Sequence, residues 1–402
     1  MALLVVVGVP PALVLSGFSG GPFWILLTVL FYGFAMKKTG LAERIAYYIL
    51  SLFPSTYAGI LGAFALIGFI LSFGIPSMTV RTAIMIPIAW TLVQSLELPP
   101  QSRGSALIML TTLEMATVPG IASLYGSLTG PIVVAAFQAK NLPLTWLDYA
   151  RVVAPPTIVL ALLILIANQI VLRPEKPLAA PRTFARDRLR KLGTLTKDEW
   201  VTALVVVLSI VYWTTDRYHH LPSFLVGLAG VVAFGVTGIL KDSEIATGVS
   251  WPFLLFVGGV FGLANVIQEY KVTDWLAGFA VPMAGQLTSS VFGLSLVVAL
   301  AMFGLRFLDP STFISTSVLF LSVVDIASAA HIPPLVLMAA VVLASVPFWL
   351  PYQNFWLAMT ESMTSGQAFT ARQRLLLATT YAVCVVASLA VAVIYWKLTG
   401  VV

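Results

Sequence analysis

The sequence predicts an all-α polytopic membrane protein with two inverted-topology repeats, each containing a re-entrant hairpin and a broken transmembrane helix. Hydrophobic residues make up 59% of the 402 positions and charged residues only 9%, whereas roughly 25% of a soluble domain is charged. The pairs Pro76-Ser77 and Pro310-Ser311 lie 234 residues apart, and Pro99-Pro100 and Pro333-Pro334 share that offset. Related features at one fixed offset are typical of structural repeats in membrane proteins.

Several apolar segments approach the length of about 20 residues that a helix needs to cross a bilayer. They are Ala2–Ser16, Pro22–Met36, Val152–Leu172, Leu221–Leu240, Trp251–Gln268 and Leu375–Trp396. The first has no basic start and continues directly into more apolar sequence, so we assign it to the fold rather than to a cleaved signal peptide. The only cysteine, Cys384, lies in the last segment, which excludes an intrachain disulfide.

A basic stretch divides the chain and fixes its orientation. Eight of the 22 Lys and Arg residues fall in Arg173–Lys197, and the positive-inside rule places such a loop in the cytoplasm. We therefore expect a first repeat at 1–172, a cytoplasmic linker at 173–198 and a second repeat at 199–402. Glu175 and Asp187 interrupt the basic residues, which favours a solvated connector over a nucleic-acid-binding surface. The expected surroundings are the lipid bilayer.

In the first half, a short amphipathic segment, Leu41–Leu52, is expected to lie on the inner membrane surface. The hairpin 57–96 follows, with two apolar arms around the polar tip Pro76–Thr79 and with Arg81 just beyond the tip. We expect this hairpin to enter and leave the membrane from the cytoplasmic side. In the second half, the hairpin 287–327 is expected to enter from the outside.

The tip of the second hairpin carries Arg306 and then Asp309, Pro310, Ser311 and Thr312. An outer interfacial segment at 271–282 precedes it and corresponds to Leu41–Leu52 of the first half. Each hairpin is followed by an apolar stretch that is too long for one span. The first, 104–137, contains Pro119-Gly120, Gly126 and Gly130-Pro131, and the second, 334–364, contains Pro347 and Pro351. Both stretches therefore predict helices that are broken within the membrane.

The distribution of charge supports this topology. It places 15 of the 22 Lys and Arg residues inside and five outside, and it leaves Arg81 and Arg306 within the membrane. One helix, Trp200–Trp213, has no counterpart in the first half. We expect that counterpart before Met1, so the chain looks short at its N-terminus.

The hairpin tip Ser77–Ala89, SMTVRTAIMIPIA, resembles the Ser-Asn-Thr-Ala-Thr-Ala-Ala…Pro-Ile motif of the divalent anion:sodium symporter (DASS) family of the ion transporter superfamily. Lys38–Ala42 looks like another feature of that superfamily. Ala116–Pro131 is similar to the family's Gly-Thr-Pro-Pro-Asn helix break, and Leu350–Asn354 occupies the equivalent position in the second repeat. The resemblance covers nearly the whole chain.

The resemblance implies an elevator-type secondary active transporter of dicarboxylate, citrate or sulfate, without enzyme activity or an organic cofactor. It also implies a homodimer in the bacterial inner (plasma) membrane, coupled to sodium. By position, it assigns substrate contacts to Ser77, Met78, Thr79, Ser127, Thr129, Ser311, Thr312, Gln353 and Asn354. Sodium ions are expected at Ser77, Gly126 and Ser311.

One departure keeps a second coupling mode open. Met78 stands where the family has an asparagine, and a thioether is a poor ligand for the hard sodium ion. Backbone carbonyls still offer sodium ligands. The alternative is that a buried carboxyl, Glu114 or Asp309, carries a proton, since burial favours the neutral form of a carboxyl group.

The residue types at the tips fit an anion. An unwound helix end offers free N–H groups and the positive end of a helix dipole, and serine and threonine add hydroxyl donors. A guanidinium within the bilayer is costly and indicates function, so Arg81 is a candidate for a bidentate bond to a carboxylate or sulfate. The structural alternative is an ion pair with Glu114. Arg306 and Asp309, three residues apart, are spaced to pair with each other.

The sequence leaves three rival functions open. One is a proton-driven permease for another organic anion of the same superfamily. Another is a membrane enzyme, which would need clustered catalytic groups at one membrane surface, and the sequence shows no such cluster. The third is an inactive scaffold.

Overall fold

The computed structural model describes residues 1–402 except Pro76, Leu128, Lys176, 179–183, His220, 272–289, Pro310 and Ser311. The described residues form helices and no strands, which confirms the predicted all-α class. Most of the expected outer segment 271–282, and Pro310 and Ser311 at the second tip, lie outside the described residues.

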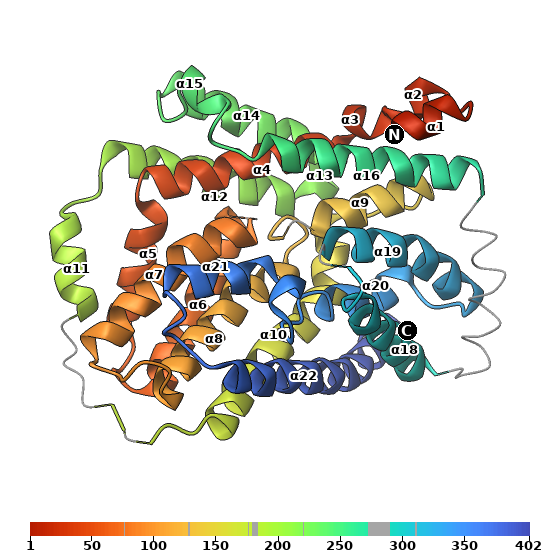
Figure 1. Cartoon of the computed structure of the whole chain (residues 1–402). Coiled ribbons are helices and arrows are strands. Elements are labelled where there is room, and N and C mark those ends of the chain that lie inside the picture. The colour runs from red at the N-terminus through yellow and green to blue at the C-terminus, as the bar shows by residue number, and fades with distance from the viewer. Residues whose placement is uncertain are drawn as a thin grey trace.

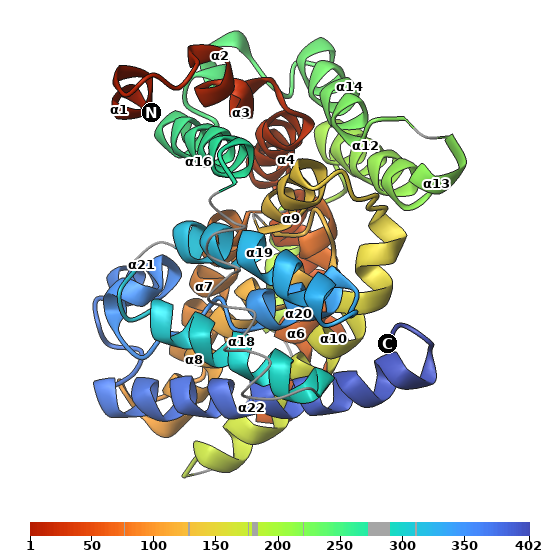
Figure 2. The same ribbon diagram turned by 90° about the vertical axis from the view of Figure 1, so that its right-hand side faces the viewer.

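The helices are arranged in two layers (Figure 2). The layer that we call the scaffold layer contains α1 (Ala2–Val6), α2 (Pro11–Val14), α3 (Ser16–Ser19), α4 (Gly21–Lys38), α12 (Lys197–Thr214), α13 (Asp216–His219), α14 (Ser223–Val236) and α16 (Trp251–Glu269). The other, the hairpin layer, contains α6 (Tyr57–Gly74), α7 (Met78–Ser95), α8 (Arg103–Thr117), α9 (Thr129–Ala139), α10 (Trp146–Val171), α18 (Val291–Leu305), α19 (Thr312–Ala329), α20 (Pro334–Leu343), α21 (Phe355–Met363) and α22 (Ala371–Leu398).

Five helices of the described chain are long and apolar enough to cross a membrane. They are α6, α10, α16, α22 and the helical stretch Arg103–Ala122. A further candidate is formed by α4 and α5 (Leu41–Leu52), which bend by 65° between them. The bounds of α5 coincide with those of the predicted amphipathic segment. Its buried face packs against α6 and against α11 (Phe184–Leu192), a helix within the linker.

The N-terminal segment 2–16 does not form the single helix that its composition suggests. It contains α1 and α2 and the start of α3, because Gly8 takes a left-handed φ of +94° and Pro10-Pro11 cannot continue a helix. These short helices pack on α16 by close backbone contact. A Cβ on Gly17 would lie 2.2 Å from Gly258 O, and one on Gly262 would lie 2.1 Å from Val14 O. Small residues are required at such a crossing.

The two hairpins lie at opposite sides of the molecule (Figure 1). Helices α6 and α7 form the first, and α18 and α19 form the second. Serine and threonine start three of the four arms: Gly59 N–H donates to Thr56 Oγ1, Val80 N–H to Ser77 Oγ and Gly293 N–H to Ser290 Oγ. These side chains accept from N–H groups that have no partner within the helix.

Each hairpin is followed by an interrupted helix. In the first half, α8 ends at Thr117, a short 3-10 helix η1 spans Pro119–Ala122, and α9 begins at Thr129. In the second half, α20 ends at Leu343, η2 spans Pro351–Gln353, and α21 begins at Phe355. The interruptions occur in the proline- and glycine-containing stretches that predicted them.

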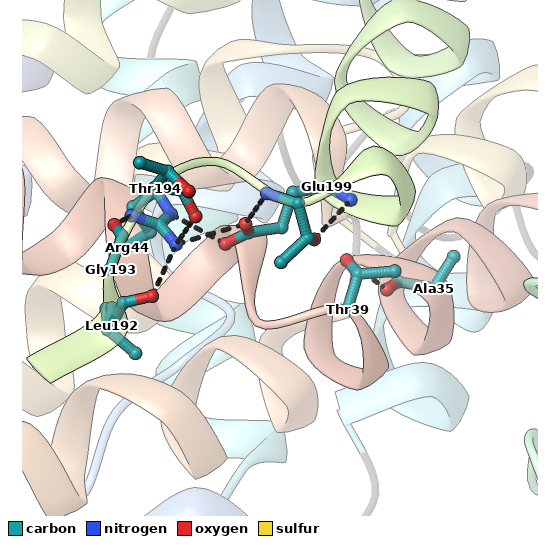
Figure 3. A network of polar contacts seen from close by, with 8 residues as sticks. Ala35, Thr39, Arg44, Leu192, Gly193, Thr194 and Glu199 are labelled. Carbon is teal, nitrogen blue, oxygen red and sulfur yellow. Dashed lines mark hydrogen bonds and ion pairs between the residues drawn. The ribbon is translucent and has the colours of Figure 1, made fainter.

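Arg44 ties the linker to the scaffold layer (Figure 3). Its guanidinium donates to the carbonyl oxygens of Leu192, Gly193 and Thr194 at 2.8–3.2 Å, and Nε donates to Glu199 Oε1 at 2.6 Å. Burial alone would raise the pKa of Glu199, but the bonds from Arg44 and from the Thr196 N–H bring that pKa below its ordinary value. The linker, expected to be a solvated connector, is thus anchored at its C-terminal end.

Candidate functional site

At the first tip, Ser77 precedes α7, and Met78 and Thr79 are the first two residues of that helix. Ser77 caps α7, with its Oγ accepting from Val80 N–H at 3.3 Å. Ser77 and Met78 are buried and Thr79 is half-buried. The first N–H groups of α7, and the positive end of its dipole, therefore face the tip within the hairpin layer.

Arg81, one turn further along α7, is fully buried and bonded to backbone carbonyls. Its Nη1 donates to Ile75 O at 2.5 Å and to Gly126 O at 2.7 Å, and its Nε donates to Ala116 O at 2.8 Å. Its Nη2 has no hydrogen-bond partner among the described residues. The guanidinium thus joins the first tip to both sides of the break between α8 and α9.

The alternative ion pair between Arg81 and Glu114 does not form. Among the described residues, Arg81 forms no ion pair with a carboxylate within 4.0 Å. Glu114 Oε2 instead accepts from Asn168 Nδ2 at 2.6 Å, and the same nitrogen donates to Thr111 Oγ1 at 3.0 Å. Glu114 Oε1 has no partner among the described residues. Asn168 was missed from the sequence, although an amide in an otherwise apolar span was an available signal.

Glycines make room for the Arg81 guanidinium. A Cβ on Gly120 would lie 2.3 Å from Arg81 Nη2 and 2.3 Å from Gly126 O. A Cβ on Gly130 would lie 1.5 Å from Leu124 O. The glycines that mark the break in the sequence are therefore needed for close backbone approach around the arginine.

The first break also holds a buried pair of hydroxyl groups. Ser127 Oγ and Thr129 Oγ1 are 2.7 Å apart, and both side chains are buried. Thr129 is the first residue of α9. The pair therefore stands at a second helix N-terminus, close to the Gly126 carbonyl that Arg81 binds.

In the second break, Gln353 and Asn354 turn their side chains toward the backbone. Asn354 Oδ1 accepts from Leu357 N–H at 3.0 Å and so caps α21, and Gln353 Oε1 accepts from Leu350 N–H at 2.9 Å. Gln353 Nε2 has no partner among the described residues. Both residues thus shape the break, and the Gln353 amide retains a donor.

The second tip contains the expected pair of Arg306 and Asp309, with Nη1 and Oδ2 3.9 Å apart. The shorter bonds go elsewhere. Arg306 Nη1 donates to the backbone oxygen of Asp309 at 2.8 Å, and Nη2 donates to Gln353 O. Asp309 Oδ2 accepts from Ser315 N–H at 2.9 Å and from Ser315 Oγ at 2.6 Å, which stabilises the first turn of α19. Thr312, the first residue of α19, is buried.

A bond between the two halves joins these parts. Trp356 Nε1, on α21, donates to Thr79 Oγ1 at the first tip at 3.0 Å. Together with the bonds of Arg81 and Arg306, it connects the first break, the first tip, the second break and the second tip in that order. Of the residues predicted from the sequence, this series of bonds passes through Thr79, Arg81, Gly126, Arg306, Asp309 and Gln353. Trp356 itself gave no signal in the sequence.

Comparison with known proteins identifies the family. The profile described as "Sodium:sulfate symporter transmembrane region" matches residues 2–399. The chain belongs to this family. The resemblance that was inferred from the tips and breaks is therefore confirmed, and the protein is an integral membrane protein.

Similar proteins of this family include transporters from plants and bacteria. The chain is 24% identical to "Dicarboxylate transporter 1, chloroplastic" of Spinacia oleracea over 82% of its own length and 59% of that protein. It is also 24% identical to "Inner membrane protein YbhI" of Escherichia coli, over 66% of its length and 57% of that protein. The chain thus spans about three-fifths of the length of these curated relatives.

A solved structure shows the same fold. The Alcanivorax borkumensis YdaH transporter, which was reported to have an unusual topology, superposes with a TM-score of 0.65. The match covers 97% of this chain and 88% of that chain at 14% sequence identity. The likeness at this identity concerns the fold alone.

Proposed function

We propose that the protein is a secondary active transporter of small di- or trivalent anions, such as dicarboxylate, citrate or sulfate. One observation carries the proposal. Two hairpin tips and two helix breaks, far apart in the sequence, are linked by hydrogen bonds from Arg81, Trp356 and Arg306. Buried helix ends of this kind are binding sites for charged substrates in transporters.

The anion is held by helix N-termini and hydroxyl groups. The N-terminal ends of α7, α9, α19 and α21 lie at the tips and breaks and offer N–H groups with positive dipole ends. The proposed contacts are Ser77, Thr79, Ser127, Thr129, Ser311 and Thr312, with the backbone of Met78 and the amides of Gln353 and Asn354. Arg81 adds one donor, Nη2, and its fixed positive charge.

Sodium coupling would use backbone carbonyls near Ser77, Gly126 and Ser311. Gly126 O already accepts one bond from Arg81, but a carbonyl oxygen has two lone pairs and keeps one for a cation. Proton coupling is the second candidate, and a specific observation favours Glu114 over Asp309 for it. The buried Glu114 Oε1 lacks a donor among the described residues, whereas Asp309 Oδ2 accepts two bonds. A buried oxygen without a donor suits a protonated carboxyl.

The two-layer arrangement supports an elevator motion, in which the hairpin layer carries the anion past the scaffold layer. The helices that flank both tips and both breaks belong to the hairpin layer (Figure 2). A homodimer in a bacterial inner membrane completes the proposal and rests on the family alone.

Uptake of labelled succinate, citrate and sulfate into proteoliposomes tests this function. We expect uptake to follow either a sodium gradient or a proton gradient. Replacing the hydroxyl pair with Ser127→Ala and Thr129→Val should lower uptake at least tenfold, since one hydroxyl of the pair donates to the other and the remaining donor to the charged ligand is lost. Thr91→Val is the matched control, because its hydroxyl bonds only to Pro87 O within α7.

The same assay separates the two coupling modes. Glu114→Gln should leave sodium-driven uptake intact and abolish proton-driven uptake. Equal uptake by the wild type, the double variant and empty liposomes would reject the proposed function. Uptake of a labelled solute that carries no negative charge, in place of these anions, would reject the proposal that the substrate is an anion.

A further inference from the structure

We infer that Arg81 and Arg306 are a matched pair of positioning residues that hold each hairpin tip against the helix break of its own half. The inference rests on the proposed function, because the tips matter as the place where the anion binds. Both arginines then share one role, which is to fix backbone segments through bonds to carbonyl oxygens. Arg81 plays this role through Nε and Nη1, so its Nη2 remains the donor that the proposed function leaves for the anion.

The bonds of Arg81 run from hairpin to break. On the hairpin side the acceptor is Ile75 O, in the residue that follows α6. On the other side the acceptors are Ala116 O, in the last turn of α8, and Gly126 O, before α9. One planar side chain thus fixes three segments relative to one another.

Arg306 repeats this arrangement in the second half. It is the residue that follows α18 and is also fully buried. It donates to Asp309 O at the hairpin tip and to Gln353 O in the helix break. The two arginines come from different arms of their hairpins, one after the tip and one before it, yet they join the same pair of features.

The acceptors explain why arginine is present. The last carbonyl groups of a helix have no partner within it and carry the negative end of its dipole. Inside the membrane these carbonyls need donors other than water. A guanidinium supplies five donors in a rigid fork and a permanent positive charge. Arg81 therefore neutralises the C-terminal ends of α6 and α8 and leaves the N-terminal ends of α7 and α9 for the anion.

Gly120 offers a way to displace Arg81 without changing any charge. A methyl group at this position would lie 2.3 Å from Nη2 and 2.9 Å from Cζ of Arg81, and 2.3 Å from Gly126 O, which is one of the acceptors of Arg81. Gly120→Ala should therefore push the guanidinium off its carbonyl acceptors. Gly304→Ala, on α18, is the matched control, because a Cβ there meets nothing within 4 Å.

Hydrogen–deuterium exchange of the purified protein without any substrate tests the inference. The variants are Arg81→Lys, Arg306→Lys, Gly120→Ala and Gly304→Ala. In Arg81→Lys and Gly120→Ala, amides of 75–79 and 116–127 should exchange at least tenfold faster, which is about the effect of losing one hydrogen bond to a charged group. In Arg306→Lys the same change should appear at 306–309 and 350–354 and not in the first half. Gly304→Ala should match the wild type.

Either of two results would overturn the inference. Wild-type exchange at both breaks in Arg81→Lys and Arg306→Lys would show that the arginines position nothing. Faster exchange throughout α10 and α22 in the same variants would show a general loss of stability instead. The readout needs no transport, so an expected exchange pattern together with absent anion uptake would reject the proposed function and retain the positioning role.

Discussion

At the scale of single residues, the buried arginines of this protein are satisfied mainly by backbone carbonyl groups. Arg81 and Arg306 bind carbonyls at helix breaks, and Arg44 binds three carbonyls of the linker. Arg44 differs because its carboxylate partner, Glu199, lies at hydrogen-bond distance, with Nε and Oε1 2.6 Å apart, whereas Arg306 Nη1 and Asp309 Oδ2 are 3.9 Å apart. Each cation therefore fixes a stretch of irregular backbone that helical bonds cannot fix.

Glu199→Gln should destabilise the protein at neutral pH, and the destabilisation should decrease as the solution is acidified below about pH 4.5. The folded-state pKa of Glu199 lies below its ordinary value of 4.5. The contribution of the ionised Glu199 to the free energy of unfolding is therefore present above about pH 4.5 and is lost as the pH falls through the lowered pKa. Breaking a buried pair costs about 3 kcal/mol, so the melting temperature in detergent should lie well below that of the wild type at pH 7. The difference should shrink as the pH falls below about 4.5.

The control for this experiment is Glu175→Gln. Glu175 forms an exposed pair with Arg103, with Nε and Oε1 3.8 Å apart, and exposed pairs contribute little. The melting temperature of Glu175→Gln should follow that of the wild type throughout. If the difference in melting temperature between Glu199→Gln and the wild type stays constant as the pH falls from 7 to 4 and below, Glu199 does not stabilise the protein as an ionised carboxylate.

The sequence identified the two intramembrane arginines but not their partners. A charged residue in an apolar hairpin is visible in the sequence because it is rare there. The acceptors of Arg81 are backbone atoms of segments up to 45 residues away, and no side-chain pattern encodes them. Glu114 was a reasonable partner by charge, but Asn168 occupies its carboxylate. The substrate role of Arg81 stays a prediction.

At the scale of secondary-structure elements, long apolar helices were predictable and short ones were not. Apolar length defined α10, α16 and α22 to within a few residues, except that α10 begins at Trp146 and extends the predicted Val152–Leu172. The prediction of a single helix at 2–16 was wrong, because it followed the apolar composition and neglected that Pro10-Pro11 interrupts a helix. The interrupted helices in 104–137 and 334–364 were predicted correctly, because the excess length for one span and the internal prolines both indicate an interruption.

Gly262→Ala should disturb the crossing of α2 and α3 with α16. The new Cβ would lie 2.1 Å from Val14 O, a backbone atom that cannot move aside alone. Overpacking of this kind costs about 1–3 kcal/mol, so the melting temperature in detergent should fall. Gly235→Ala, on α14, should leave it unchanged, since a Cβ there meets nothing within 4 Å. A melting temperature equal to that of the wild type for Gly262→Ala would refute this close crossing.

At the scale of the whole molecule, the scaffold layer touches the hairpin layer at the first tip. A Cβ on Gly33 of α4 would lie 3.3 Å from Ile75 Cγ2 and 3.9 Å from Val80 Cβ. A Cβ on Gly74 would lie 2.5 Å from Met36 Sδ. Glycines thus allow close contact where an elevator motion requires the two layers to slide. In the proposed elevator motion the tip would leave α4, and a covalent link across this contact would then stop transport.

The pair Gly33→Cys and Val80→Cys, in a Cys384→Ala background, makes that link. The two Cβ atoms would be 3.9 Å apart, within the range of about 3.5–4.5 Å that disulfides require. Oxidation in proteoliposomes should abolish anion uptake, and a reductant should restore it, whereas each single cysteine variant should be insensitive to both. Cleavage of the chain between the two positions, followed by gel electrophoresis, reports whether the disulfide has formed completely. If uptake persists after complete cross-linking, the layers do not move apart here. Transport would then have to proceed by local opening of the tips. The bonds of Arg81 and Arg306 would break during transport, while the two layers would keep their relative position.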